Sequence, residues 1–123
     1  MLLIWGVCSI IVLLWERNIA SDNLITIALI FKKLLTSTHS MFLGCSSLQS
    51  INSSSFNTTN VEDMSYMFSY CSSLQSINLS SFNTTNVKNM FGMFNGCSSL
   101  KKENVKIGSY GKKILDQLKY IKE

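Results

Sequence analysis

Hydrophobic and polar residues alternate in two short stretches of the chain, and each stretch then changes to a helical spacing. In the clearer stretch the hydrophobic order is L-x-x-I-x-L-x-x-F, at Leu74, Ile77, Leu79 and Phe82. Alternation along Ile77–Ser80 predicts a strand with one buried face and one exposed face. The polar residues at 83–86 then predict a turn, because short side chains of this kind bond the nearby backbone.

The residues after this turn have a different period. Hydrophobic side chains recur there at steps of three and four, at Val87, Met90, Met93 and Phe94. This spacing favours a short helix or 3₁₀ segment. In the preceding stretch, Thr59-x-x-Glu62 matches the pattern of a helix capping box. Each unit is therefore predicted to be a short strand, a turn and a short helical segment.

The whole pattern returns after 26 residues. Residues 41–66 and 67–92 are identical at 19 of 26 aligned positions, and a third copy opens at residue 93. The clearest markers of the period are three cysteines, Cys45, Cys71 and Cys97. A repeat this regular predicts a solenoid in which each unit packs against its neighbours. Residues that recur with the repeat are expected to support the fold rather than to carry chemistry.

Three regions are predicted, which together give an α/β fold with parallel strands. Residues 1–40 form an apolar N-terminal segment, which is either a signal or anchor sequence or a set of capping helices, one of them over Leu24–Phe31. Residues 41–107 form the leucine-rich-like repeats. Residues 108–123 form an amphipathic C-terminal capping helix. The hydrophobic face of that helix is predicted to carry Ile114, Leu115, Leu118 and Ile121.

Residues 1–33 raise the question of a membrane. Met1–Trp15 is apolar almost throughout, but it is shorter than the roughly 20 residues that span a bilayer. Its length suits the core of a signal peptide, although no basic residue precedes it and no clear cleavage site follows it. Cleavage, membrane insertion through residues 1–33, packing on the repeats and an origin outside the repeat family are all open alternatives at this point.

Charge and chemistry narrow the function classes. The net charge is +4, and residues 101–123 alone carry seven lysines against three acidic residues. We interpret these lysines as a solvated helix face and expect no nucleic-acid partner, because only Tyr110 and Tyr120 interleave them. His39 is the only histidine, and the repeat supplies no nucleophile–base pair and no metal cluster. The sequence therefore predicts no enzyme, no metal site and no cofactor.

The recurring cysteines and asparagines are predicted to be structural. Equivalent residues of stacked strands lie about 4.8 Å apart, whereas the Cβ atoms of a disulfide lie about 3.8 Å apart, so Cys45, Cys71 and Cys97 are expected to be buried and unbridged. Two N-x-S/T sequons each occur twice, once in each full repeat. Their recurrence favours structural asparagines in turns or strands over glycosylated ones. These sequons begin at Asn52, Asn57, Asn78 and Asn83.

One stretch of the repeat is similar to a known family. Cys71–Leu100, with the sequence CSSLQSINLSSFNTTNVKNMFGMFNGCSSL, resembles the BspA-like leucine-rich repeat surface proteins. It carries their C-S-S-L, S-x-F-N-T and N-V-x-x-M-x-x-M-F elements, and the resemblance extends over about residues 41–105. The resemblance implies a leucine-rich-repeat-type solenoid, a cell-surface or secreted setting, and a role in binding or adhesion.

The strand face is the predicted binding surface. The 26-residue register aligns nine outward residues in three columns, which are Ser50/Ser76/Lys102, Asn52/Asn78/Asn104 and Ser54/Ser80/Lys106. A polar face with so little charge suits a protein or glycan partner. We therefore expect a non-enzymatic binding or adhesion module. The alternative is a membrane-anchored structural spacer, or a degenerate repeat fragment with no activity of its own.

Overall fold

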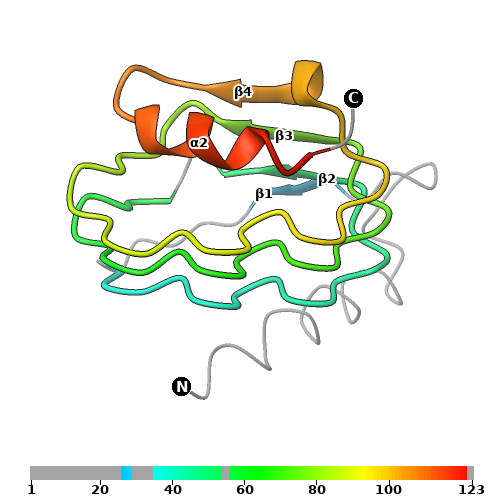
Figure 1. The fold of residues 1–123 in the computed structure, drawn as a ribbon, viewed down its shortest axis with the longest axis horizontal. Helices are drawn as coiled ribbons and strands as arrows, with labels where there is room; N and C mark the ends of the chain where they lie inside the picture. Colours follow the sequence, from blue (N-terminus) through cyan, green and yellow to red (C-terminus); the bar gives the residue numbers. More distant parts are fainter. Residues whose placement is uncertain (1–25, 29–34, 54–55, 122–123) are drawn as a thin grey trace.

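Four short strands form one parallel sheet in the order of the chain. The computed structural model describes residues 26–28, 35–53 and 56–121. The strands of the described part are β1 Thr26–Ala28, β2 Ser50–Asn52, β3 Ser76–Leu79 and β4 Val105–Ile107. Figure 1 shows them along one side of the molecule, with long extended returns on the other side. Each return brings the chain back to the start of the next parallel strand.

The pairing of β2 with β3 follows the sequence repeat. Ile51 pairs with Ile77 in a parallel register, and both side chains are 3% exposed. The rings of Phe56 and Phe82 follow the same register, with centroids 5.9 Å apart. The parallel strands and the 26-residue register predicted for these two units are therefore confirmed. Ser53 also faces the core, where the next unit has Leu79, and both are fully buried.

The sheet begins before the repeat that the sequence displays. β1 lies parallel to β2, and Ile27 pairs with Ile51. The helix predicted over Leu24–Phe31 is therefore wrong at Thr26–Ala28, which is a strand. This pairing joins residues 24 positions apart rather than 26, so a search at the repeat period misses it. The rest of the predicted N-terminal helices and membrane segment lies outside the described residues.

Consecutive tight turns replace the helical segment predicted in each unit. The amide of Met93 bonds the carbonyl of Met90 at 3.3 Å, and that of Cys97 bonds the carbonyl of Phe94 at 3.2 Å. Alternate amides bond the neighbouring unit instead, as when Phe68 donates to Met93 at 2.9 Å. The turns closed at Met93 and Cys97, and their equivalents in the earlier units, each contain a residue with positive φ, a geometry that an α-helix excludes. These residues are Ser40, Gly44, Tyr66, Tyr70, Gly92 and Gly96.

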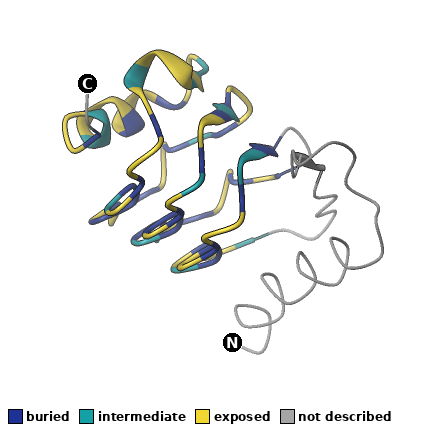
Figure 2. Cartoon of the chain, turned by 90° about the vertical axis from the view of Figure 1, so that its right-hand side faces the viewer, coloured by how far each residue is buried: buried dark blue, intermediate teal, exposed yellow. Residues whose placement is uncertain are grey.

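The core lies between the strands and these turn segments. Figure 2 shows buried residues along the inside of each successive unit, with exposed residues outside. The phenylalanines of successive units stack almost parallel: the ring centroids of Phe42 and Phe68 are 5.3 Å apart, and those of Phe68 and Phe94 are 5.9 Å apart. Aromatic and thioether side chains in register thus bury the apolar face that one unit cannot bury alone.

The third unit departs from the register of the first two. Ile77 pairs with Val105, and Asn78 pairs with Lys106, so the offset here is 28 residues. The two additional residues are taken up by a 3₁₀ turn, η1 at Lys102–Asn104. Val105 consequently occupies the strand position that Ile51 and Ile77 hold in the earlier units.

The C-terminal segment packs over the end of the core. It contains the 3₁₀ turn η2 at Lys112–Ile114 and the helix α2 at Leu115–Leu118, which Figure 1 shows in front of β3 and β4. Ile114 and Ile121 are buried. The helix predicted over 108–123 is thus much shorter than expected, and Leu115, which is 56% exposed, does not belong to the buried face. In the part of the chain that is described, no helix is long and apolar enough to cross a membrane.

Candidate functional site

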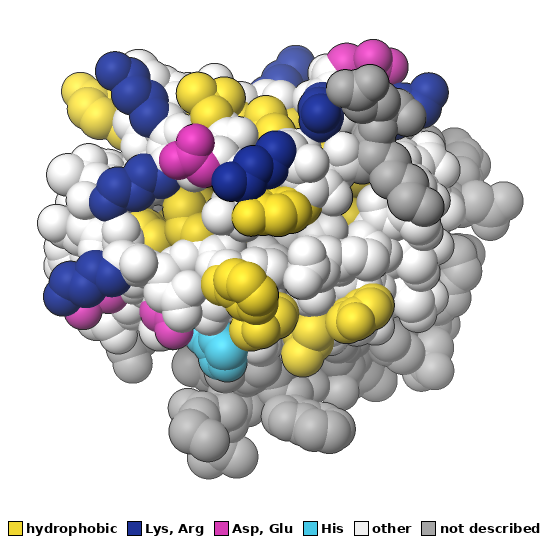
Figure 3. Space-filling model, in the orientation of Figure 1, with side chains coloured by type: hydrophobic (Ala, Val, Ile, Leu, Met, Phe, Trp, Pro, Cys, Tyr) yellow, Lys and Arg dark blue, Asp and Glu magenta, His cyan; other side chains and the backbone are white. Residues whose placement is uncertain are grey.

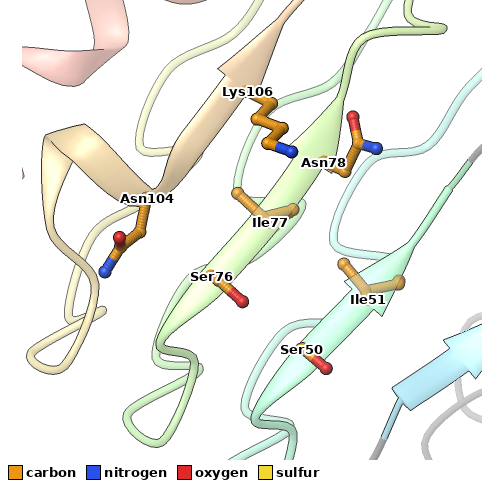
Figure 4. A pocket seen from close by; sticks show the side chains of 7 residues that line it. All are labelled: Ser50, Ile51, Ser76, Ile77, Asn78, Asn104 and Lys106. Carbon is orange, nitrogen blue, oxygen red and sulfur yellow. The ribbon is translucent and has the colours of Figure 1, made fainter.

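A hollow of about 270 Å³ lies on the outer face of the sheet. Figure 4 shows its lining side chains, which come from β2, β3 and the η1–β4 segment. The lining residues are Ser50, Ile51, Ser76, Ile77, Asn78, Asn104 and Lys106. Five of them belong to the nine binding residues that the sequence predicts. Ile51 and Ile77 were not predicted, because their strict alternation marks them as core residues, which they also are.

The remaining predicted residues are distributed differently. Asn52 pairs with Asn78 in the sheet, as expected, and Ser54 lies outside the described residues. Ser80 follows β3 and does not line the hollow. Lys102 lies in η1 rather than on a strand.

The columns predicted for the third unit are wrong. Asn78 stands beside Lys106 rather than Asn104, because the η1 turn shifts the chain by two residues before β4 begins. This shift places Lys106 two residues away from its predicted position, beside Asn78 instead of Ser80. Figure 4 shows its side chain extending from β4 toward Asn78 on β3. The hollow therefore gains a cation beside an amide.

Hydrogen bonds hold Asn78 in place at this site. Its side-chain oxygen accepts bonds from the amide of Ser80 at 3.1 Å and from the hydroxyl of Ser80 at 2.6 Å. Its main-chain carbonyl accepts a bond from the buried hydroxyl of Ser53 at 2.6 Å. Ser80 thus supports the site by orienting Asn78, although it does not line the hollow.

The electrostatic character of the hollow is simple. Lys106 is the only charged residue among those that line it, and Ser50, Ser76, Asn78 and Asn104 supply hydroxyl and amide groups. Such a surface can hydrogen-bond a neutral polar ligand or the acceptor oxygens of a partner. It contains no general base and no nucleophile beside a base, so nothing in it supports covalent chemistry.

A second polar cluster joins the first two units on the side of the turns. His39 Nδ1 lies 2.7 Å from the hydroxyl oxygen of Ser65, and that hydroxyl donates to Asp63 at 2.6 Å. The hydroxyl oxygen of Ser40 lies 3.2 Å from His39 Nε2. Although serine, histidine and aspartate meet here, the amides of Ser40 and Met41 already bond carbonyls of Ser65 and Thr38. These amides cannot form an oxyanion hole, so we interpret the cluster as a link between units.

The recurring cysteines have two different chemical states. Cys71 donates to the carbonyl of Phe42 at 3.1 Å, and Cys97 donates to that of Phe68 at 3.0 Å. Both thiols are free and buried, as predicted. Burial raises the pKa of Cys71 to about 12 and that of Cys97 to about 11. Cys45, in contrast, is disulfide-bonded, so the prediction that it is unbridged is wrong.

The remaining candidate positions are the metal-ligating side chains and the sequon asparagines. No group of three or more potential metal-ligating side chains occurs within residues 26–28, 35–53 and 56–121. Asn57 and Asn83 use their side-chain oxygens to accept the amides of Thr59 and Thr85, at 3.2 and 3.0 Å. These two sequon asparagines, together with Asn78, therefore have structural roles in their own turns.

Comparison with protein families finds a match over most of the chain. A family model described as "Mycoplasma protein of unknown function, DUF285" matches residues 23–119. This range includes β1, which the visible repeat does not. No curated protein and no solved structure matches the chain.

Proposed function

Because the chain belongs to the family of Mycoplasma proteins of unknown function, DUF285, whose description states no activity, we propose a function from the strand face. The chain is a short solenoid of leucine-rich-repeat type, similar to the BspA-like surface proteins. It acts as a non-enzymatic binding or adhesion module at the cell surface or after secretion. Its partner is a protein or a glycan that contacts the strand face.

The observation that carries this proposal is the polar hollow. Ser50 and Ser76 face it from equivalent positions of neighbouring strands, and Asn78, Asn104 and Lys106 surround it. The hollow is shallow and mostly uncharged. A bound partner therefore replaces water as the hydrogen-bonding group at this surface, and each such bond contributes roughly 1 kcal/mol. Several aligned hydrogen bonds of this size give modest affinity. Modest affinity is sufficient for adhesion when many copies of the protein bind at the same time.

The state of Cys45 supports an exported location. Its sulfur is disulfide-bonded, and disulfides persist in oxidising compartments while they are rare in the cytosol. This supports secretion or exposure at the cell surface over a cytosolic role. Fractionation of tagged full-length protein, with non-reducing electrophoresis of each fraction, tests the location directly.

Binding through the strand face is tested by placing charges in the hollow. Ser76 and Asn104 line it and have exposed side chains. We expect the double variant Ser76→Glu and Asn104→Glu to lose at least tenfold in affinity. The two carboxylates repel the acceptor oxygens of the partner, and their bound water must be removed on binding. The measurement is binding of labelled full chain to arrays of glycans and of extracellular proteins, followed by titration of each hit.

The matched control introduces the same charges elsewhere. Ser46 and Asn60 are also exposed and do not line the hollow, so the variant Ser46→Glu with Asn60→Glu should bind like the wild type. Circular dichroism should show that both variants are folded. Equal loss in the two variants, or loss in the control alone, would show that the strand face is not the binding surface. A wild-type chain that binds nothing on either array would also count against the proposal.

A further inference from the structure

The C-terminal segment forms a second surface, which differs from the strand face because it is basic and partly hydrophobic. We call it the C-terminal face and define it by Tyr110, Lys112, Leu115, Lys119 and Tyr120. Its large hydrophobic members are exposed, with Tyr110 at 70%, Leu115 at 56% and Tyr120 at 59%. Figure 3 shows lysine and hydrophobic side chains interspersed over the part of this view where Figure 1 places α2.

The packing of η2 and α2 explains why these residues point outward. Ile114 and Ile121 turn into the core. Lys113 is held against the neighbouring unit, because its ammonium group donates to the carbonyls of Thr85 and Val87 at 3.1 and 2.7 Å. Positions 112, 115 and 119, spaced by three and four residues, are then left on the outer side of this short helical segment.

A polar hollow adjoins this face. It has a volume of about 450 Å³ and brings two lysines together with hydroxyl groups. Its lining residues are Thr84, Thr85, Ser109, Tyr110, Lys112 and Lys113. The ammonium and hydroxyl groups of this lining are donors to anionic oxygens, such as those of a phosphate. No carboxylate lines the hollow, and Asp116 is the one acidic residue in α2.

We propose that the C-terminal face docks on the surface of an anionic lipid membrane. Lipid phosphates lie at the lysines, and Tyr110, Leu115 and Tyr120 enter the headgroup region. Lysine and tyrosine suit this boundary, because each has an apolar body and a polar end. Within residues 108–121 the three lysines Lys112, Lys113 and Lys119 outnumber the single acidic residue, Asp116, and this excess supplies the charge complementarity. The aliphatic side chain of Leu115 favours lipid over nucleic acid, whose bases stack on aromatic rings.

The experiment is co-sedimentation of the full chain with lipid vesicles. We expect binding to phosphatidylcholine vesicles that contain phosphatidylglycerol, little binding to phosphatidylcholine alone, and release by added salt. The double variant Lys112→Gln and Lys119→Gln should bind anionic vesicles roughly 30-fold more weakly, at about fivefold per lysine. Leu115→Ser should weaken binding several-fold, and Asp116→Asn should strengthen it.

Matched variants remove the same groups elsewhere. Lys88→Gln with Lys101→Gln lowers the net charge equally at two exposed positions, and Leu43→Ser removes another exposed leucine, which is 46% exposed. Both controls should stay within about threefold of the wild type, since long-range attraction is screened by salt. Equal effects of test and control variants would overturn the proposal. Binding that does not depend on lipid charge, on salt or on any of the substitutions would indicate that residues 1–33 cause the association, and this outcome would also overturn the proposal. Binding to polynucleotides with no vesicle binding would replace lipid by nucleic acid.

Discussion

At the residue scale, burial determines how the cysteines react. Cys71 and Cys97 are both buried, and their thiols donate to main-chain carbonyls of the preceding unit. Their raised pKa values, about 12 and about 11, leave almost no thiolate at neutral pH. The recurrence in the sequence was sufficient to predict this burial. It could not predict the disulfide of Cys45, because the spacing argument considered only partners in the same column.

The thiols give a direct prediction. We expect Cys71 and Cys97 of the native protein to resist alkylation at pH 8, because only the thiolate reacts and both groups are protonated and enclosed. Unfolding without reductant should expose two thiols, since the chain has four cysteines and one disulfide removes two of them. Reduction should then expose all four. Mass spectrometry after alkylation counts them. Rapid native labelling, or four thiols before reduction, would contradict this assignment.

The same raised pKa values set a pH limit. Unfolded cysteine ionises at a pKa of 9.0, whereas native Cys71 stays protonated to about pH 12. Thiol ionisation therefore favours the unfolded chain above pH 9, at up to about 1.4 kcal/mol per pH unit for each thiol, and it has no effect below that. The native state therefore keeps its full stability with respect to thiol ionisation at neutral pH, and it loses stability as the pH rises above 9.

At the element scale, the strands were predictable and the turn segments were not. Alternation around Ile51 and Ile77 specifies a buried face, and the repeat specifies the neighbour. Residues at steps of three and four, however, fit both a helix and a chain of tight turns. Gly92 and Gly96, at φ values of 66° and 72°, were the available signal for turns. Tyr66 and Tyr70 hold the equivalent positions in the preceding unit at positive φ, which obscured this signal.

Alanine substitutions at two glycines distinguish the cost of steric crowding from the cost of an unfavourable backbone conformation. A Cβ atom at Gly108 would lie 2.1 Å from the carbonyl oxygen of Ser80, whereas one at Gly44 would have no atom within 4 Å. Gly108→Ala should therefore destabilise the protein by roughly 3 kcal/mol, because two backbones must move apart. Gly44→Ala should cost only about 1 kcal/mol, which is the penalty of a positive φ. Urea denaturation measures both values, and a reversed order would mean that β4 does not pack this closely.

At the scale of the whole molecule, the units meet through a nearly constant offset. Bonds such as those from Phe42 to Met67 and from Phe68 to Met93 join residues 25 positions apart, in one unit after another. The period in the sequence predicted this stacking for the first two full units. It failed at β4, because a two-residue insertion at η1 changes the offset without changing the inward side chains.

A constant offset implies that a unit can be added. We expect insertion of a second copy of residues 67–92 directly after residue 92 to give a folded chain that melts at a higher temperature. Each new interface repeats one that already exists, and repeat stabilities sum approximately with their interfaces. The control is a scrambled insert of the same composition, which should lower the melting temperature in calorimetry. A copy that destabilises as much as the scrambled insert would show that the units are not interchangeable.

The same offset has a genetic consequence. Slippage during replication of a tandemly repeated coding sequence gains or loses whole copies, and here each in-frame copy encodes one self-complementary layer. Descendants of this gene can therefore differ in length while every layer keeps its old neighbours. The strand face lengthens or shortens with the copy number, so the extent of the polar surface can change through slippage alone while the packing of the core stays the same.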